Sequence, residues 1–156
     1  MPPGPPPVTA AGRDVTGERR RLGHGLALRP VGDAGMGHDL VLVGGRSLAL
    51  VEGAENLAQS LAVALLTAPG TDPFHVRFGF DGLRVLTQGL TPPLALEMLR
   101  LSVLRTVTAD ARVAEVLDLT LEETSPGSRR WRVDVVVRTV LGGVLETVIG
   151  EVTADD

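Results

Sequence analysis

The pattern of apolar and polar positions divides the chain into a short N-terminal segment and a longer second segment. Residues 1–21 are rich in proline and hold few large apolar side chains. Ordering each residue costs roughly 1–2 kcal/mol, and this segment buries too little to offset that cost. We therefore expect residues 1–21 to form a disordered N-terminal arm and residues 22–156 to form one domain.

Two stretches show the spacing of amphipathic helices. The first helix is predicted from about Ala54 to Thr67, where Pro69 and Gly70 end it. The second is predicted from Pro92 to about Val107, with Thr91 as N-cap and proline at the first helical position. The first has one core stripe at i, i+4, i+7 and i+8, which is Leu57, Leu61, Ala64 and Leu65.

The second helix is apolar on nearly its whole circumference. One side carries Leu94, Met98 and Leu101, and the other carries Leu96, Leu99, Val103 and Val107. Such a helix is covered on both sides. Either it is a central core helix, or a partner protein covers its second side.

Strand patterns occupy the remaining parts of the body. Two apolar runs around Gly44-Gly45 predict a tight hairpin over residues 39–51. Three strands with turns at residues 125–128 and 142–143 follow the second helix, and we find no internal repeat. Their inward positions are predicted to be Leu117, Leu119 and Leu121, then Trp131, Val133, Val135 and Val137. The fold class is therefore α+β: two main helices packed on a mixed or antiparallel sheet, with a C-terminal three-strand meander.

The last strand is apolar on both faces. Val144, Val148 and Val152 share one face, and Leu145 and Ile149 share the other. At a sheet edge such a strand invites pairing by another chain. In a central position it would instead be covered by helices of the same fold.

The amino-acid composition excludes or disfavours several classes of binding site and partner. The chain has 156 residues, no cysteine and a net charge of −4, and all 15 of its basic residues are arginine. Without cysteine the chain cannot form disulfide bonds, and its negative net charge disfavours a nucleic-acid partner. No apolar run approaches the roughly 20 residues that a membrane-spanning helix needs, so we expect no membrane insertion. We also expect no signal peptide. The three histidines have no metal-ligand spacing, and no nucleotide-binding or nucleophile motif is present, so we expect no metal site, no cofactor and no enzyme activity. A glycosidase needs two carboxylates facing one cleft, and sequence alone does not exclude such a pair among Glu52, Asp72 and Asp81.

The order of segments resembles a known family. The stretches "LALVEGAENLAQSLAVALLTAPG", "VRFGFDGL" and "RVAEVLDLTLEE", with a "GxENLxQ" helix start, are similar to the small baseplate wedge family of contractile phage tails and contractile injection systems, the family of the phage gene-twenty-five product. The resemblance spans roughly residues 48–152.

Two motifs of that family can be placed on this sequence. Its Glu-Pro-Arg triplet after the second helix falls on Asp110, Ala111 and Arg112, so the arginine is kept, the acid is shorter and the proline is absent. The resemblance implies that this turn grips the helical core bundle of the larger wedge proteins, although without proline the turn is less pre-set. Its aromatic-glycine loop matches Arg77, Phe78 and Gly79.

The resemblance also implies a function. The protein would be a structural, sheath-initiating subunit, cytoplasmic and then assembled into the particle baseplate, with six copies per baseplate. The first sheath ring would be templated by strand exchange on the final strand, through Val144, Leu145, Val148, Ile149 and Val152. Some relatives carry a lysozyme label, which no arrangement of residues here supports. A peptidoglycan hydrolase and a small cytosolic regulatory binding module remain as alternatives.

Overall fold

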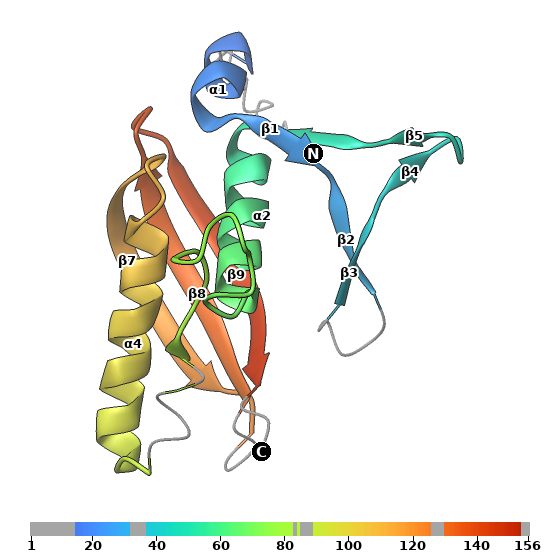
Figure 1. Ribbon diagram of the computed structural model, residues 1–156. Helices are drawn as coiled ribbons and strands as arrows, with labels where there is room; N and C mark the ends of the chain where they lie inside the picture. Colours follow the sequence, from blue (N-terminus) through green and yellow to red (C-terminus); the bar gives the residue numbers. More distant parts are fainter. Residues whose placement is uncertain (1–14, 32–36, 83, 85–88, 126–129, 154–156) are drawn as a thin grey trace, which may run out of the picture.

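The body of the protein is a two-layer α+β sandwich. The computed structural model describes residues 15–31, 37–82, 84, 89–125 and 130–153. An antiparallel sheet in the order β7-β8-β9 is formed by β7 (Val113–Glu123), β8 (Arg130–Thr139) and β9 (Val144–Thr153). Both long helices, α2 (Gly53–Leu66) and α4 (Pro92–Thr108), cover the same face of this sheet (Figure 1). The expected fold class and C-terminal meander are thereby confirmed.

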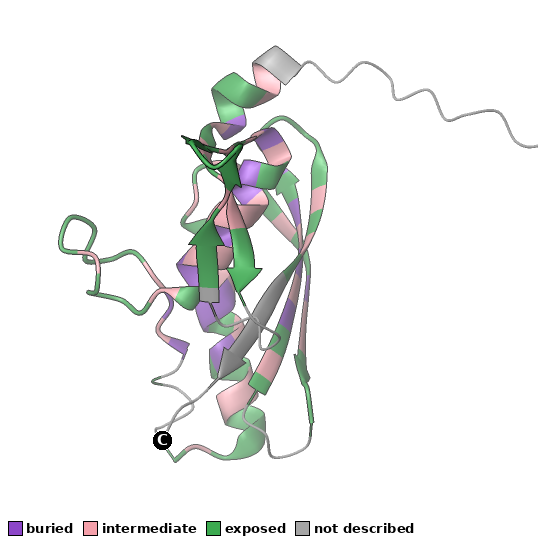
Figure 2. Ribbon diagram, turned by 90° about the vertical axis from the view of Figure 1, so that its right-hand side faces the viewer, coloured by how far each residue is buried: buried purple, intermediate pink, exposed green. Residues whose placement is uncertain are grey.

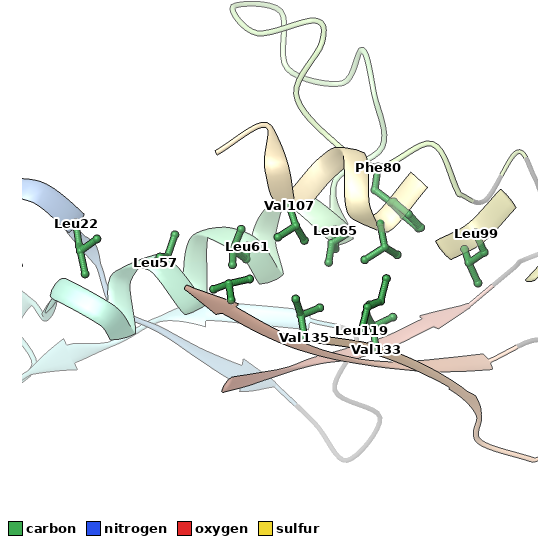
Figure 3. Packing of buried hydrophobic residues seen from close by; sticks show 12 residues of the cluster. Leu22, Leu57, Leu61, Leu65, Phe80, Leu99, Val107, Leu119, Val133 and Val135 are labelled. Atoms are coloured by element: carbon green, nitrogen blue, oxygen red, sulfur yellow. The ribbon is translucent and has the colours of Figure 1, made fainter. Parts of the chain in front are cut away.

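The core lies between the helices and the sheet (Figure 3). The predicted stripe of α2 is buried as expected, including Ala64. Burying each leucine of this stripe contributes about 1.5–3 kcal/mol. The main core residues are Leu57, Leu61 and Leu65 of α2, Leu99, Val103 and Val107 of α4, and Leu119, Val133, Val135 and Val137 of the sheet.

One predicted core position on β7 is wrong. Leu117 is exposed, whereas Val116 packs against the core. The register between β7 and β8 shifts between Val116 and Asp118, as it also does between Val113 and Glu115. Each β-bulge adds one unpaired residue, and after it the side chains that were expected to point inward point outward. The prediction assumed strict alternation of inward and outward side chains, so it was wrong in this half of the strand.

The helix α4 is covered on one side only. Leu94, Met98 and Leu101 are exposed, so the interpretation as a central core helix is wrong. Thr91 occupies the N-cap as predicted, but its side chain makes no capping hydrogen bond. None of the helices in the described ranges combines the length and apolar character needed to cross a membrane.

A short helix replaces part of the expected disordered arm. α1 covers Val15–Leu22, and Leu22 is buried in the core against α2. Gly23 ends this helix with a φ of 77°, and its N–H donates to Arg19 O. A buried leucine, a glycine cap and the ion pair between Arg19 and Glu52 hold this helix on the body, while residues 1–14 of the predicted arm lie outside the described residues.

The segment between α1 and α2 forms three two-stranded ribbons instead of one hairpin. Residues 24–31 and 37–52, which we call the β-arm, extend away from the body (Figures 1 and 2). The predicted tight turn at Gly44-Gly45 is present, but each of the two apolar runs is split into two strands. The ribbons pair β1 (His24–Leu26) with β6 (Leu50–Glu52), β2 (Leu28–Val31) with β3 (Gly37–Leu40), and β4 (Leu42–Val43) with β5 (Ser47–Leu48).

Candidate functional site

A cleft of about 560 Å³ joins two of the three predicted site segments. Asp110, Ala111 and Arg112, in the turn after α4, lie on one side of the cleft, and Phe78 of the aromatic-glycine loop also lines it. α2, the start of β1 and the end of α4 supply the rest of the wall. Among the residues whose side chains the structure describes, the predicted sheath strand β9 contributes none to the cleft wall, so the described candidate residues form two separate surfaces.

An internal ion pair organises the turn. Arg112 Nε donates to Asp110 Oδ1 at 2.9 Å, and Nη2 donates to Oδ2 at 2.6 Å. The backbone N–H of Arg112 also donates to Oδ1 at 3.0 Å. These hydrogen bonds hold the pKa of Asp110 below its usual value, and they raise the pKa of Arg112. Asp110 is thereby kept as a carboxylate and is unsuited to act as a general acid near neutral pH.

The same arginine connects the turn to the N-terminal part of the chain. Its Nη1 donates to Leu22 O at 3.0 Å, and the buried Asn56 donates to the same oxygen through Nδ2 at 2.9 Å. The end of α1, the start of α2 and the turn after α4 are therefore fixed at one carbonyl. Arg112 uses three of its five N–H groups in these bonds, which leaves two for a ligand or partner.

A glutamine holds the β-arm against the body. Gln59 of α2 accepts a hydrogen bond from Leu28 N through Oε1 and donates through Nε2 to Leu26 O, both at 2.8 Å. Its amide thus bonds the edge of the β-arm as a neighbouring strand would. Because Gln59 also lines the cleft, it couples the β-arm to this site.

Replacing this glutamine is expected to loosen the β-arm and leave the sheet intact. Gln59→Ala removes both bonds at a partly exposed site, so we expect a loss of about 1 kcal/mol of stability. Amide hydrogen exchange should accelerate several-fold in residues 24–52 and stay unchanged in β8. Gln59→Glu is the matched variant, because it keeps the acceptor for Leu28 N and loses only the donor. Equal exchange rates in wild type and Gln59→Ala would contradict this role.

The aromatic-glycine loop is folded around the end of α2. Asp72 Oδ1 accepts hydrogen bonds from Phe74 N and His75 N, and the bond from Phe74 N lowers the pKa of this exposed carboxyl. Phe80 is buried in the core, and its N–H donates to Thr67 O at 2.8 Å. Of the predicted motif, Phe78 lines the cleft, Gly79 passes the helix end, and Arg77 lies beside the exposed Phe74.

The strand β9 lies at the edge of the sheet. It pairs with β8 and with no other described strand, so the interpretation as a central strand is wrong. Val144 is 63% exposed and Val148 is 55% exposed, whereas Leu145 packs against the core. Of Ile149 and Val152 the structure describes only the backbone. A register shift leaves Gly150 unpaired and sets Val152 opposite Trp131, so the predicted grouping of Val152 with Val144 and Val148 does not match the register.

The carboxylates considered for hydrolysis lie on separate elements, and each has its own partners. Glu52 pairs with Arg19 at 3.2 Å, and Asp81 pairs with Arg105 at 3.4 Å and accepts a hydrogen bond from Ser102. Neither lines the cleft, where the acidic residue is Asp110. The histidines are equally dispersed, with His24 on β1, His38 on β3 and His75 in the loop. In the part of the chain that the structure describes, no three acidic or histidine side chains form a metal-binding group.

Sequence reasoning missed the two amides that organise the cleft. Asn56 and Gln59 belong to the helix start "GxENLxQ". This motif was used only as part of the family resemblance, and neither amide was assigned a structural role. Asn56 is buried, and both side chains bond to backbone groups of residues 22–28. A buried amide requires hydrogen-bond partners, and this was the available signal that the preceding segment packs against α2.

Comparison with known proteins shows a shared fold. No protein-family model and no curated protein matches the sequence. A crystal structure of a candidate tail lysozyme from Geobacter sulfurreducens matches with a TM-score of 0.56 and 18% sequence identity. The match covers 76% of this chain and 98% of that chain. At this identity the likeness establishes a common fold, and it transfers no activity and no site residue.

Proposed function

We propose that this chain is a structural subunit of a contractile, phage-tail-like particle. In this proposal it is a cytoplasmic protein until it enters the baseplate, where it bridges the helical core bundle of the larger wedge proteins to the first sheath ring. Sheath assembly is templated by strand exchange on β9. The observation that carries the proposal is the edge position of β9 together with its exposed valines. The fold shared with a candidate tail lysozyme supports the same setting.

The energetics of strand addition favour a role within an assembly. About six backbone hydrogen bonds contribute roughly 3–9 kcal/mol at about 0.5–1.5 kcal/mol each. Association costs about 4–15 kcal/mol, so a single joint is marginal. Linked copies in a ring raise the local concentration of every joint and make the whole contact effective.

The cleft is the proposed contact for the wedge bundle. Its wall combines apolar groups, such as Phe78 and Ala111, with the guanidinium of Arg112. A helix that places an apolar side chain in the cleft could present a carboxylate to the two free N–H groups of this arginine. The internal ion pair keeps the guanidinium in a fixed orientation before binding, which reduces the entropic cost of association.

We propose that the role is non-catalytic. A retaining or inverting glycosidase requires two carboxylates about 5–9.5 Å apart across one cleft. Glu52 and Asp81 are each held by an arginine on a different element, and Asp110 is held ionised. Clearing of a bacterial cell-wall suspension by the purified chain, abolished by Glu52→Gln or Asp81→Asn, would refute this part of the proposal.

Blocking the sheet edge is expected to prevent sheath binding. Val148→Lys places a charge on the exposed face of β9, which disfavours pairing by another strand and removes nothing from the core. Co-purification with the sheath subunit of the same particle should fall at least tenfold, while the melting temperature and wedge binding stay unchanged. Val140→Lys is the matched control, because Val140 is also exposed but lies in the turn before β9. Undiminished sheath binding by Val148→Lys would reject β9 as the template.

A further inference from the structure

A second cavity lies where α1 meets the sheet, at the start of β9. Figure 1 shows α1 at the same end of the sheet as the turn between β8 and β9. The cavity between them measures about 450 Å³, and we call it the α1 pocket. Its wall combines aliphatic side chains with one glutamate. This wall includes Glu18 and Leu22 of α1, Ala54 of α2, Leu141 of the turn, and Val144 and Leu145 of β9.

The walls of the α1 pocket are held in place by contacts outside it. On α1, Leu22 is buried in the core, and Arg19 pairs with Glu52 at 3.2 Å. On the opposite wall, Thr139 N donates to Gly143 O at 2.8 Å and closes the turn between the two strands. The pocket is therefore formed before any partner arrives, and filling it requires little ordering of this chain.

Glu18 is the only acidic residue in this wall, and its carboxylate has no cation beside it. It lies one helical turn before Leu22, so both side chains are on the face of α1 that packs against the body. The side chain is half-buried, and its Oε2 would lie 3.2 Å from a Cβ at Gly53. Over the part of the chain that the structure describes, the carboxylate accepts no hydrogen bond and pairs with no arginine, since the adjacent Arg19 is engaged with Glu52. A carboxylate that has lost part of its water gains from a cation placed next to it.

The α1 pocket is continuous with the free edge of the sheet. Among the described strands β9 pairs only with β8, and Leu145 of β9 points to the helix face, where it packs against the core. In a strand added to this edge, the residue opposite Leu145 points to the same face, with its Cβ about 5 Å from that of Leu145. A long side chain at this position follows the apolar wall toward Glu18.

We infer that the α1 pocket binds an arginine or lysine side chain of the strand that adds to β9. The aliphatic stem of this side chain packs on Leu141 and Leu145, and its cationic group pairs with Glu18. An apolar side chain would leave the carboxylate unpaired, and an acidic side chain would be repelled by it. The inference rests on the proposed function, because the incoming strand is the one that is exchanged on β9. Backbone hydrogen bonds accept any strand, whereas this pocket selects one with a basic residue in the correct register.

Glu18→Gln tests the inference with an almost unchanged side-chain shape. The affinity of this variant for the sheath subunit of the same particle should fall about fivefold or more at low salt, and the loss should shrink at high salt. Glu55→Gln is the matched control, because Glu55 is exposed in the first turn of α2 and does not line the pocket. Equal affinities of wild type and Glu18→Gln, or an equal loss in Glu55→Gln, would overturn the inference.

Val148→Lys separates this inference from the proposed function. If Val148→Lys abolishes sheath binding and Glu18→Gln does not weaken it, then β9 is the template and the α1 pocket does not select the strand. If the wild-type chain does not bind the sheath subunit, both the proposed function and this inference are wrong.

A cross-link identifies the occupant of the α1 pocket directly. The chain has no cysteine, so Leu141→Cys, at a position that is 41% exposed, carries a benzophenone label at one defined site. On illumination of the complex it should label a segment of the sheath subunit within a few residues of an arginine or lysine. Leu101→Cys, on the exposed side of α4, is the control and should label the sheath subunit far less. Labelling of a sheath segment without a basic residue, of a second copy or of residues 1–14 of the same chain would reject the assigned occupant.

Discussion

Arg112→Ala is expected to destabilise the protein by about 2–3 kcal/mol, because it removes three hydrogen bonds that involve a charged group. The side chains of Arg112 and Asp110 are only 24% and 20% exposed, so water cannot fully replace the lost partner. For a chain of this size the melting temperature should fall by roughly 5–10 °C. The effect should extend to α1, because the carbonyl of Leu22 keeps only Asn56 as a donor.

The pH dependence of this loss identifies its cause. The pKa of Asp110 is lower in the folded chain than in the unfolded chain, so its stabilising contribution is complete above the unfolded value of about 4. That contribution disappears as the pH falls through the lower, folded value. The difference in unfolding free energy between wild type and Arg112→Ala should therefore be largest near neutral pH and shrink below about pH 4. A difference that stays constant down to pH 2 would show that the ion pair is not its origin.

A conservative variant separates stability from partner binding. Arg112→Lys keeps the charge and loses the bidentate geometry, so it should recover part of the stability. Wedge binding, if it uses the two remaining N–H groups, should stay impaired in Arg112→Lys at a temperature where the variant is fully folded. Full recovery of wedge binding by lysine would mean that only the positive charge matters at this turn.

The parts of the fold that could be predicted from the sequence are those with an uninterrupted period. The stripe of α2 and the inward valines of β8 follow the helical and strand periods without a break, and both are buried as expected. β7 and β9 contain bulges, and each bulge reverses the parity on which the prediction depended. The position of a bulge depends on how two strands pair with each other. The pattern of apolar residues within a single strand does not contain this information.

The β-arm and the cleft could be predicted only in part, because they depend on contacts between residues that are far apart in the sequence. The turn at Gly44-Gly45 is local and was expected. The three ribbons, however, are joined by backbone hydrogen bonds among Ala27, Val41 and Ala49, which lie between the strands and far apart in the sequence. Arg112 was identified by resemblance, whereas its acceptor at Leu22 lies 90 residues away. That acceptor is the last residue of α1, and the other residues of this helix belong to the segment 1–21 whose composition predicts disorder. A single buried leucine in α1 reversed this expectation, because tertiary packing outweighs composition when an apolar side chain reaches the core.

Gly79→Ala is expected to be the most damaging change in the loop, with a loss of about 3 kcal/mol or more. Gly79 has a φ of 117°, which strains any residue with a side chain. A Cβ at this position would also lie 2.5 Å from Thr67 O, and a backbone oxygen at a helix end cannot rotate away. Relieving the clash would pull Phe80 from the core and break its hydrogen bond to Thr67 O.

A second glycine of the same loop separates the clash from the backbone strain. Gly70 also has a positive φ, of 81°, but nothing lies within 4 Å of the position of its Cβ. Gly70→Ala should therefore cost only about 1 kcal/mol, which is the strain alone. Urea denaturation of both variants measures the difference, which should be at least about 2 kcal/mol. Because Phe78 lines the cleft next to Gly79, Gly79→Ala should also weaken wedge binding, whereas Gly70→Ala should not. Equal stability losses in the two variants would mean that the close approach of the loop to α2 does not hold Phe80 and Phe78 in place.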